Sequence, residues 1–293
     1  MLGHQNIQSV HWRHMATLST LQKIALAKAA HRAVKLYRRA RCLPMQDRFH
    51  RGGLEWKLDL NEGIDFSIFL LGVFEAKAVR FYRRHLRPGD VVLDIGANIG
   101  AHTLHIAAAV KPGGRVLAFE PTAYAFSKLS ANLALNPQLE TLVSTNQVLL
   151  GSGSVEVPEK IYAGWPLEFG HNLHPDHGGE PHSTTGASSG TLNDLLERLD
   201  RVDFIKIDVD GHELAVLQGA GKMLERSRPP ILIELCPHVC VIHGYSFAAL
   251  VDLLTGAGYR FENLDGKPLP TDPGALEQII PRKGAINALA VPN

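Results

Sequence analysis

This 293-residue chain has few cysteines, no long apolar run and no acidic residue in its first 46 positions. Its three cysteines, Cys42, Cys236 and Cys240, are too few for a disulfide framework, so the sequence favours a reducing cytoplasm. No apolar run reaches the roughly 18 residues of a membrane span. Lys23 and Lys28 interrupt the most apolar N-terminal stretch, so no signal peptide is expected.

Acidic residues are absent from residues 1–46, which carry eight Lys or Arg. The rest of the chain holds 22 basic and 29 acidic residues, a formal charge of −7, which argues against nucleic acid as a partner. Residues 17–41 have helical periodicity, with an apolar face from Leu26 to Tyr37 beside a basic face. This helix either lies peripherally on an anionic membrane or packs on the acidic body or a second subunit. The packing role is favoured, because the apolar strip is mostly alanine.

Strands and helices are expected to alternate from residue 91 onward. The expected strands are 91–95, 115–119, 143–149, 203–208, 231–235, 259–263 and 286–291. The expected helices are 101–110, 123–135, 191–199, 212–225 and 246–256. A long irregular loop fills 151–190, a hairpin turning at Asn61-Glu62-Gly63 covers 54–70, and a helix covers 74–86. Such alternation predicts an α/β fold with a mostly parallel sheet and helices on both faces, one of the last two strands being antiparallel.

The segment "LDIGANIG" (93–100) places a carboxylate and two glycines at the end of an apolar strand. In parallel sheets, ligands bind beyond the carboxyl ends of the strands. Gly96 and Gly100 allow tight turns and close approach, and the following helix offers its N-terminus to an anionic group. Asp94 can accept hydrogen bonds from a cationic amine.

A second carboxylate, Glu120, ends the next expected strand, "VLAFEP". A carboxylate in that place can hold both hydroxyls of a ribose. A ligand with an amino-acid end and a ribose end is S-adenosylmethionine. Other nucleotides fit less well, because both the G-x-G-x-x-G fingerprint and the Walker motif are missing here.

With these residues the sequence resembles the FkbM family of S-adenosylmethionine-dependent methyltransferases. The resemblance runs from about Gly72 to Gly258 and rests on these segments: "GVFEAKAVRFYRRHLRPGDVVLDIGANIGAHT", "VLAFEP", "NLALN", "TLNDLL", "VDFIKIDVDGHELAVLQGA" and "ILIEL". It implies a Rossmann-like class I methyltransferase fold, whose seven-stranded sheet has the order 3-2-1-4-5-7-6. The chain would then divide into a basic helical extension (1–46), a hairpin and helix (47–87) and the methyltransferase domain (88–293).

The resemblance also implies roles for individual residues. Glu120 would hold the ribose, Pro121 would shape the adenine side, and Asp208 would lie between cofactor and acceptor. Asp94, Gly96, Asn98 and Gly100 would line the methionine end. The other residues assigned to cofactor binding are Ala97, Thr103 and Asp208. The family often has Glu-Gly-Ala-Glu where this chain has Asp210-Gly211-His212-Glu213, which leaves the role of His212 open.

Methyl transfer to a hydroxyl needs alignment and a base, and Asp208 and His212 are the catalytic candidates. His212 could equally be a surface residue at a helix start. Asp210 is interpreted first as the N-cap of the next helix. Asp208 and Asp210 could share Mg²⁺, but a metal is not favoured.

Three further patterns are weaker. The histidine-rich stretch 171–182 is interpreted as an acceptor-binding lid rather than a zinc site, and "CPHVC" with His243 as buried residues rather than a metal cluster. The string 186–190 matches G-x-S-x-G but lies in a polar loop, so a hydrolase is not expected.

The sequence therefore predicts a cytoplasmic O-methyltransferase acting on a sugar or glycan, lipid-linked or natural-product hydroxyl. The alternatives are a cofactor-binding module without catalysis, a nicotinamide-dependent oxidoreductase and a nucleic-acid methyltransferase. The strings typical of nucleic-acid methylation, a Pro-Cys pair and Asn/Asp-Pro-Pro-Tyr/Phe, are missing from the sequence.

Overall fold

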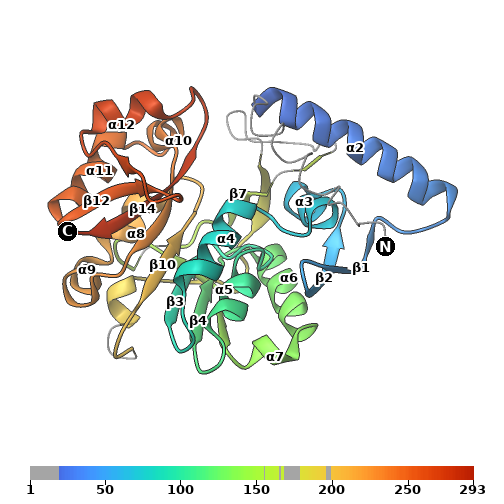
Figure 1. The fold of residues 1–293 in the computed structure, drawn as a ribbon, viewed down its shortest axis with the longest axis horizontal. Coiled ribbons are helices and arrows are strands. Elements are labelled where there is room, and N and C mark those ends of the chain that lie inside the picture. Colours follow the sequence, from blue (N-terminus) through green and yellow to red (C-terminus); the bar gives the residue numbers. More distant parts are fainter. Residues whose placement is uncertain (1–19, 155, 165, 168–178, 196–198) are drawn as a thin grey trace, which may run out of the picture.

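A computed structural model describes residues 20–154, 156–164, 166–167, 179–195 and 199–293. Its centre is an eight-stranded sheet with the order β13-β12-β14-β11-β10-β3-β4-β5 (Figure 1). The strands are β3 (Val91–Ile95), β4 (Arg115–Phe119), β5 (Val143–Asn146), β10 (Phe204–Ile207), β11 (Ile231–Leu235), β12 (Tyr259–Asn263), β13 (Pro268–Leu269) and β14 (Ile286–Pro292). β13 and β14 run in the opposite direction to the other six strands, so both pairings of β12 are antiparallel.

The expected strand order is confirmed, with the two-residue strand β13 added at one edge. β14 is the antiparallel strand that the sequence predicts near the C-terminus. The seven-stranded expectation misses β13, because a two-residue strand has no periodicity to detect. The α/β class with a Rossmann-like sheet is also confirmed.

Helices cover both faces of the sheet, and residues alternate along each strand between two apolar clusters. Leu93 and Ile205 belong to the cluster shared with α8 (Glu213–Gln218), α9 (Gly221–Ser227), α11 (Phe247–Gly256) and α12 (Pro273–Ile279). Val92 and Phe204 belong to the cluster shared with α3 (Gly63–Leu71), α4 (Ala76–His85), α5 (Thr103–Val110) and α6 (Ala123–Ala134). This alternation places Asp94 and Lys206 on the second face.

The hairpin expected at 54–70 is wrong. β2 (Leu54–Asp59) pairs with the preceding strand β1 (Gln46–Arg51), and the second apolar run forms the helix α3. The turn lies at Gly52-Gly53, both with positive φ, and two glycines are a strong hairpin signal. The alternating "IDFSIF" is typical of a strand locally, but it forms part of α3, in which Phe66 and Ile68 are both buried.

Other differences concern segment boundaries. The strand expected at 143–149 is divided into β5 and β6 (Val148–Leu150), and β6 pairs with β9 (Ser188–Gly190). The expected loop 151–190 also contains the pair β7 (Lys160–Ala163) and β8 (Glu180–Ser183). In the expected helix 191–199, the described part is a 3-10 turn, Leu192–Leu195.

The helix expected at 212–225 is interrupted between α8 and α9. Gly219 lies in that break, where a Cβ would be only 2.0 Å from the carbonyl oxygen of Gly151. Tertiary packing therefore overrides the helical pattern. α10 (Pro237–Ile242), which the sequence did not indicate, follows β11.

The N-terminal elements share a core with the sheet. α2 (Thr20–Ala40) lies along one edge of the molecule above α3 (Figure 1). The His31 ring of α2 meets the Phe66 ring of α3 edge to face at 5.3 Å. Among the described residues, no helix is both long and apolar enough to cross a membrane.

Candidate functional site

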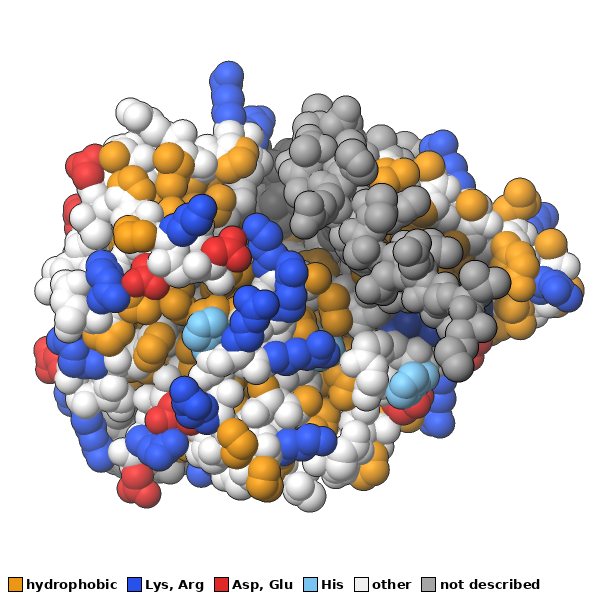
Figure 2. Space-filling model, in the orientation of Figure 1, with side chains coloured by type: hydrophobic (Ala, Val, Ile, Leu, Met, Phe, Trp, Pro, Cys, Tyr) orange, Lys and Arg blue, Asp and Glu red, His pale blue; other side chains and the backbone are white. Residues whose placement is uncertain are grey.

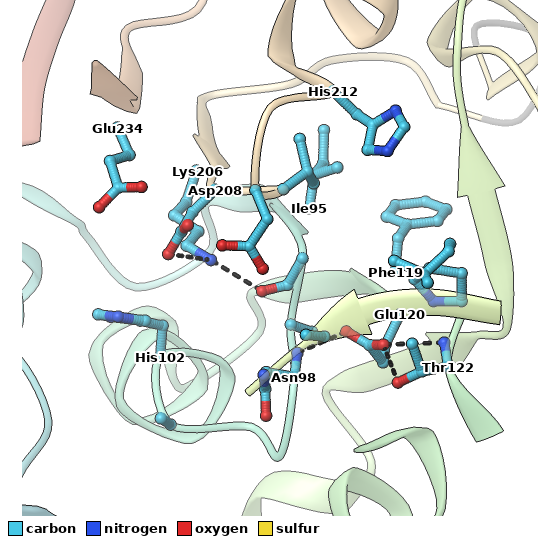
Figure 3. A pocket seen from close by; sticks show the side chains of 18 of the residues that line it. Ile95, Asn98, His102, Phe119, Glu120, Thr122, Lys206, Asp208, His212 and Glu234 are labelled. Carbon is cyan, nitrogen blue, oxygen red and sulfur yellow. Dashed lines mark hydrogen bonds and ion pairs between the residues drawn. The ribbon is translucent and has the colours of Figure 1, made fainter. Parts of the chain in front are cut away.

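A cavity of about 260 Å³ opens at the carboxyl ends of β3, β4, β10 and β11 (Figure 3). It lies where parallel α/β sheets bind ligands. Seven residues assigned from the sequence line it: Gly96, Ala97, Asn98, Glu120, Pro121, Asp208 and His212. The other three, Asp94, Gly100 and Thr103, do not line it and lie behind the loop.

The glycines of the β3–α5 loop bring protein segments together. Gly96 has φ of 78°, and a Cβ there would lie 1.8 Å from the carbonyl oxygen of Asp208. A Cβ on Gly100 would lie 2.8 Å from Leu104 and 2.9 Å from Leu129. The close approach inferred from the sequence is real, but in both cases the near neighbour is the chain itself. Gly96 thus allows the ends of β3 and β10 to meet at the cavity floor.

Glu120 is a buried carboxylate surrounded by donors. Its Oε1 accepts from the Thr122 backbone N–H at 2.9 Å and the Thr122 hydroxyl at 2.5 Å, and its Oε2 accepts from the Asn98 N–H at 3.0 Å. Burial raises the pKa of this carboxyl, and the three donors oppose that shift. Because Oε2 accepts one bond, it keeps a free lone pair on a residue that lines the cavity.

Asp94 and Lys206 form a buried pair beneath the loop. Asp94 Oδ2 accepts from the Thr103 hydroxyl at 2.6 Å, and Oδ1 lies 3.5 Å from Lys206 Nζ. Lys206 Nζ donates to the Gly96 carbonyl at 2.8 Å and lies 3.5 Å from Asp208 Oδ2. Burial lowers the pKa of Lys206, but Asp208 and Asp94 outweigh it and hold the pKa above its usual value. Lys206 therefore joins the β3 loop to the end of β10.

Sequence reasoning missed Lys206, although a signal was present. A lysine in the middle of the four-residue apolar strand "FIKI" is expensive to bury unless it has a charged partner. The same argument applies to Glu234 in "ILIEL", which also lines the cavity.

Carboxylates crowd the β10–β11 side of the cavity. Asp208, Asp210 and Glu234 all line it, near Lys206. Burial, followed by the charges of Asp208 and Glu213, raises the pKa of Asp210 to about 7. The Asp210 side chain is exposed at the surface, which weakens the burial contribution and leaves repulsion by its neighbours as the firmer cause. Burial and then Asp208 and Asp210 raise the pKa of Glu234 well above its usual value.

Asp210 does not cap the following helix, so the N-cap interpretation is wrong. The N-cap of α8 is His212, and no side chain caps this helix. Asp210 instead has a positive φ of 48°, which is unusual for a residue other than glycine. Glu213 holds the loop by accepting from the N–H groups of Val209 at 3.1 Å and Gly211 at 3.3 Å.

His212 lines the cavity above Asp208 (Figure 3). Its ring meets that of His243 at 4.6 Å. Burial, and then the His243 charge, lower the pKa of His212 to about 4. At neutral pH the ring is therefore uncharged and can accept a hydrogen bond or a proton, although it is a weak base.

A second missed group lies on the opposite wall. His102 Nε2 is 3.5 Å from Glu75 Oε2, and His102 Nδ1 lies 3.1 Å from the Tyr82 hydroxyl. Asn287 donates to Glu75 Oε1 at 2.8 Å. Burial raises the pKa of Glu75, but His102 and Asn287 outweigh it and hold the pKa below its usual value. Glu75 is thus an ionised cavity residue.

The sequence offers three places for a metal ion: Asp208 with Asp210, the histidine-rich stretch 171–182, and the segment "CPHVC" (236–240) with His243. Among the described residues, no three His, Cys, Asp or Glu side chains are grouped to hold a metal ion. Residues 171–178 of the histidine-rich stretch lie outside the described residues. Cys236 Sγ lies 3.3 Å from His238 Nδ1, whereas His243 packs on His212. Burial, and then Glu234, raise the pKa of Cys236 to about 12, so its thiol is protonated at neutral pH.

The sequence of this chain matches a known protein family. The family model described as the methyltransferase FkbM domain matches residues 94–261, more than half of the chain. The chain belongs to the FkbM methyltransferases. The matched segment begins at Asp94 and includes every cavity residue of β3, β4, β10 and β11.

Relatives with curated names include three methyltransferases. The methyltransferase sdnD of Sordaria araneosa is 31% identical over 165 residues, which cover 47% of this chain and 63% of that protein. The hexuronic acid methyltransferase AglP of Haloferax volcanii is 28% identical over 156 residues, covering 52% and 58%. The 31-O-demethyl-FK506 methyltransferase FkbM of Streptomyces tacrolimicus is 54% identical over 56 residues, covering 18% and 21%. The chain thus spans less than two thirds of each relative's length.

Among solved structures, the methyltransferase FkbM of Methylobacillus flagellatus is similar to this chain. It has 17% sequence identity and a TM-score of 0.47, and the match covers 73% of this chain and 47% of that one.

Proposed function

We propose that this FkbM-family protein is an S-adenosylmethionine-dependent O-methyltransferase for a sugar or glycan, lipid-linked or natural-product hydroxyl. The observation that carries the proposal is the asymmetric cavity. The buried and hydrogen-bonded Glu120 lies on its β4 side, and crowded carboxylates lie on its β10–β11 side. Two relatives are named for acceptors of this kind, 31-O-demethyl-FK506 and hexuronic acid, which supports the acceptor class.

The charges of the cavity suit a cationic cofactor. One lysine, Lys206, lines the cavity together with five carboxylate residues: Glu75, Glu120, Asp208, Asp210 and Glu234. S-adenosylmethionine has a sulfonium and an ammonium group, whereas a dinucleotide has an anionic pyrophosphate that an ionised carboxylate such as Glu75 would repel. The donor set therefore supports S-adenosylmethionine over a nicotinamide cofactor. When bound, this cofactor supplies an electrophilic methyl group.

Each part of the chain has a separate binding task in this proposal. The free lone pair of Glu120 Oε2 would accept from a ribose hydroxyl, and Pro121 would bound the adenine side. The loop residues Gly96, Ala97 and Asn98 would border the methionine end. Asp94, Gly100 and Thr103 would act from behind by fixing the loop, since they do not line the cavity.

Asp208 is the main base candidate. It ends β10 at the cavity, and Lys206 orients its carboxylate from 3.5 Å. Asp208 would accept the proton of the acceptor hydroxyl, with Asp210 as a close second carboxylate whose pKa is about 7. His212, uncharged at neutral pH, would hydrogen-bond the acceptor and complete the wall. A metal shared by Asp208 and Asp210 is not favoured.

Calorimetry with S-adenosylhomocysteine and with NAD tests the cofactor. Binding of the first and not of the second is expected, and the reverse result would replace the proposal with an oxidoreductase. Methyl transfer from labelled S-adenosylmethionine to a panel of sugar, lipid-linked and polyketide hydroxyls tests the reaction. Tight cofactor binding without transfer to any of these acceptors would favour a non-catalytic module. Loss of transfer in EDTA, restored by Mg²⁺, would show a metal requirement.

A further inference from the structure

The helix α2 has three distinct faces. Ala30, His31, Val34 and Arg38 pack on the body, where Ala30 and Val34 join the core cluster. The His31 ring contacts Phe66, and Arg38 Nη2 pairs with Asp47 Oδ2 at 3.0 Å. These contacts fix how the helix is rotated about its axis. The helix thus packs on the body through Ala30 of the predicted apolar face, whereas Leu26, Ala33 and Tyr37 of that face point away from it.

That outward face is an exposed apolar stripe. Leu36 is 70% exposed, Tyr37 59% and Leu26 51%. Exposed alanines at 29, 33 and 40 fill the helical spacing between them. We call Leu26, Ala29, Ala33, Leu36, Tyr37 and Ala40 the apolar stripe. Large apolar side chains this exposed and this continuous are typical of a binding surface.

A basic stripe runs beside the apolar stripe. Lys28, Arg32, Lys35 and Arg39 follow each other at spacings of four, three and four residues, and all four are exposed. α2 contains no acidic residue. Figure 2 shows hydrophobic and basic side chains gathered together at the end of the molecule where α2 lies.

We propose that α2 binds the surface of an anionic phospholipid membrane and lies in the plane of the headgroups. The basic stripe matches the charge of anionic lipids, and the adjacent apolar stripe can enter the acyl boundary. A symmetric pairing of two α2 helices through their apolar stripes would bring two basic stripes together, so charge favours an anionic membrane over that dimer. The inference does not depend on the proposed methyl transfer.

The position of α2 would bring the cavity close to that membrane. His31 of α2 packs on Phe66 of α3, and Ile64 near the start of α3 lines the cavity. One helix therefore separates the proposed membrane face from the cavity wall.

Flotation of the full chain with vesicles tests the proposal. One set is phosphatidylcholine with about 30% phosphatidylserine, and the other is phosphatidylcholine alone. At low salt we expect at least about tenfold stronger partitioning to the anionic vesicles, falling steeply as salt screens the charges. Arg32→Glu changes the charge by two units and should lower partitioning about 25-fold, because each unit contributes about fivefold. Leu36→Glu should lower it about tenfold.

Two matched variants serve as controls. Val241→Glu changes an apolar residue that is 72% exposed on α10, and Lys222→Glu reverses an exposed charge on α9. Both should partition like the unchanged protein. The proposal is overturned if the full chain stays unbound at low salt, or if Leu36→Glu and Val241→Glu bind equally. It is also overturned if the apolar stripe drives lipid-free self-association that Leu36→Glu abolishes.

Discussion

The two sides of the cavity surround their carboxylates with different neighbours. On the β3–β4 side, Glu120 accepts three protein hydrogen bonds, and Asp94 is held by Thr103 and Lys206. On the β10–β11 side, Asp210 and Glu234 are surrounded mainly by other carboxylates, and their pKa values are raised. A carboxylate fixed by hydrogen-bond donors keeps its orientation, which suits binding. A carboxylate crowded by like charges takes up protons readily, which suits chemistry.

Lys206 joins the two sides. Its ammonium lies 3.5 Å from both Asp94 and Asp208 and donates to the Gly96 carbonyl. The comparison therefore predicts different losses when the bridge, the β10 side or the β4 side is changed.

Removing the bridge should have the largest effect. Lys206→Met leaves Asp94 as an uncompensated buried charge and should lower the free energy of unfolding by about 3–5 kcal/mol. Urea denaturation measures this loss. The exposed Lys77→Met, the same substitution on α4, should stay within about 0.5 kcal/mol.

A double variant tests the cause of that loss. Lys206→Met combined with Asp94→Asn should recover part of the stability, because no buried charge is then left unpaired. A Lys206→Met protein as stable as the unchanged one would show that the bridge is unimportant.

Changing the β10 side should affect turnover more than binding. Asp208→Asn keeps the shape but removes the proton acceptor, so kcat should fall by about 10²-fold or more. Affinity for S-adenosylhomocysteine should change only a few-fold in calorimetry. Unchanged kcat would remove Asp208 from the chemistry, and equal losses of kcat and affinity would erase the distinction between the two sides.

Changing the β4 side should affect binding. Glu120→Ala removes the acceptor proposed for the ribose and should weaken S-adenosylhomocysteine binding by about 1–3 kcal/mol. Glu234→Gln, on the other side of the cavity, is the control and should bind it almost normally. If calorimetry gives Glu120→Ala full affinity in a folded protein, Glu120 does not hold the cofactor.

The sequence could predict the sheet because its signals are local and periodic. The pattern predicts the strands at 91–95, 115–119, 231–235 and 259–263 with their observed bounds, and seven of the residues it assigns to the site line the cavity. The predicted hairpin at 54–70 is wrong because "IDFSIF" alternates like a strand, whereas in the folded chain it belongs to α3 and buries Phe66 and Ile68 in the core. Local sequence cannot report such tertiary packing.

The missed site residues have a similar explanation. Lys206 and Glu234 are internal to apolar strands, and only the assembled sheet shows that their side chains meet at one cavity. The sequence predicts Asp210 as the N-cap of the next helix, because Asp often takes that position. Its positive φ is a property of the folded loop that the sequence does not report. The network of Glu75, His102 and Asn287 joins segments more than 180 residues apart along the chain and has no sequence signature.

The smallest expected effect is the dependence of turnover on pH, which distinguishes the two base candidates. Burial and the charge of Asp208 raise the pKa of Asp210, the second carboxylate beside the proposed base, to about 7. A base must be deprotonated, so activity should be full above that pKa and lost as pH falls through it, to about a tenth one unit lower. If His212 were the base, the loss would instead be centred near pH 4.

The measurement is kcat/KM against pH with a saturating methyl donor, and Asp210→Asn is the matched variant. That variant should lose the inflection near pH 7, because an amide at position 210 does not titrate there. A profile that keeps the inflection in Asp210→Asn would assign it to another group and end the argument that the crowded side of the cavity is tuned for proton transfer.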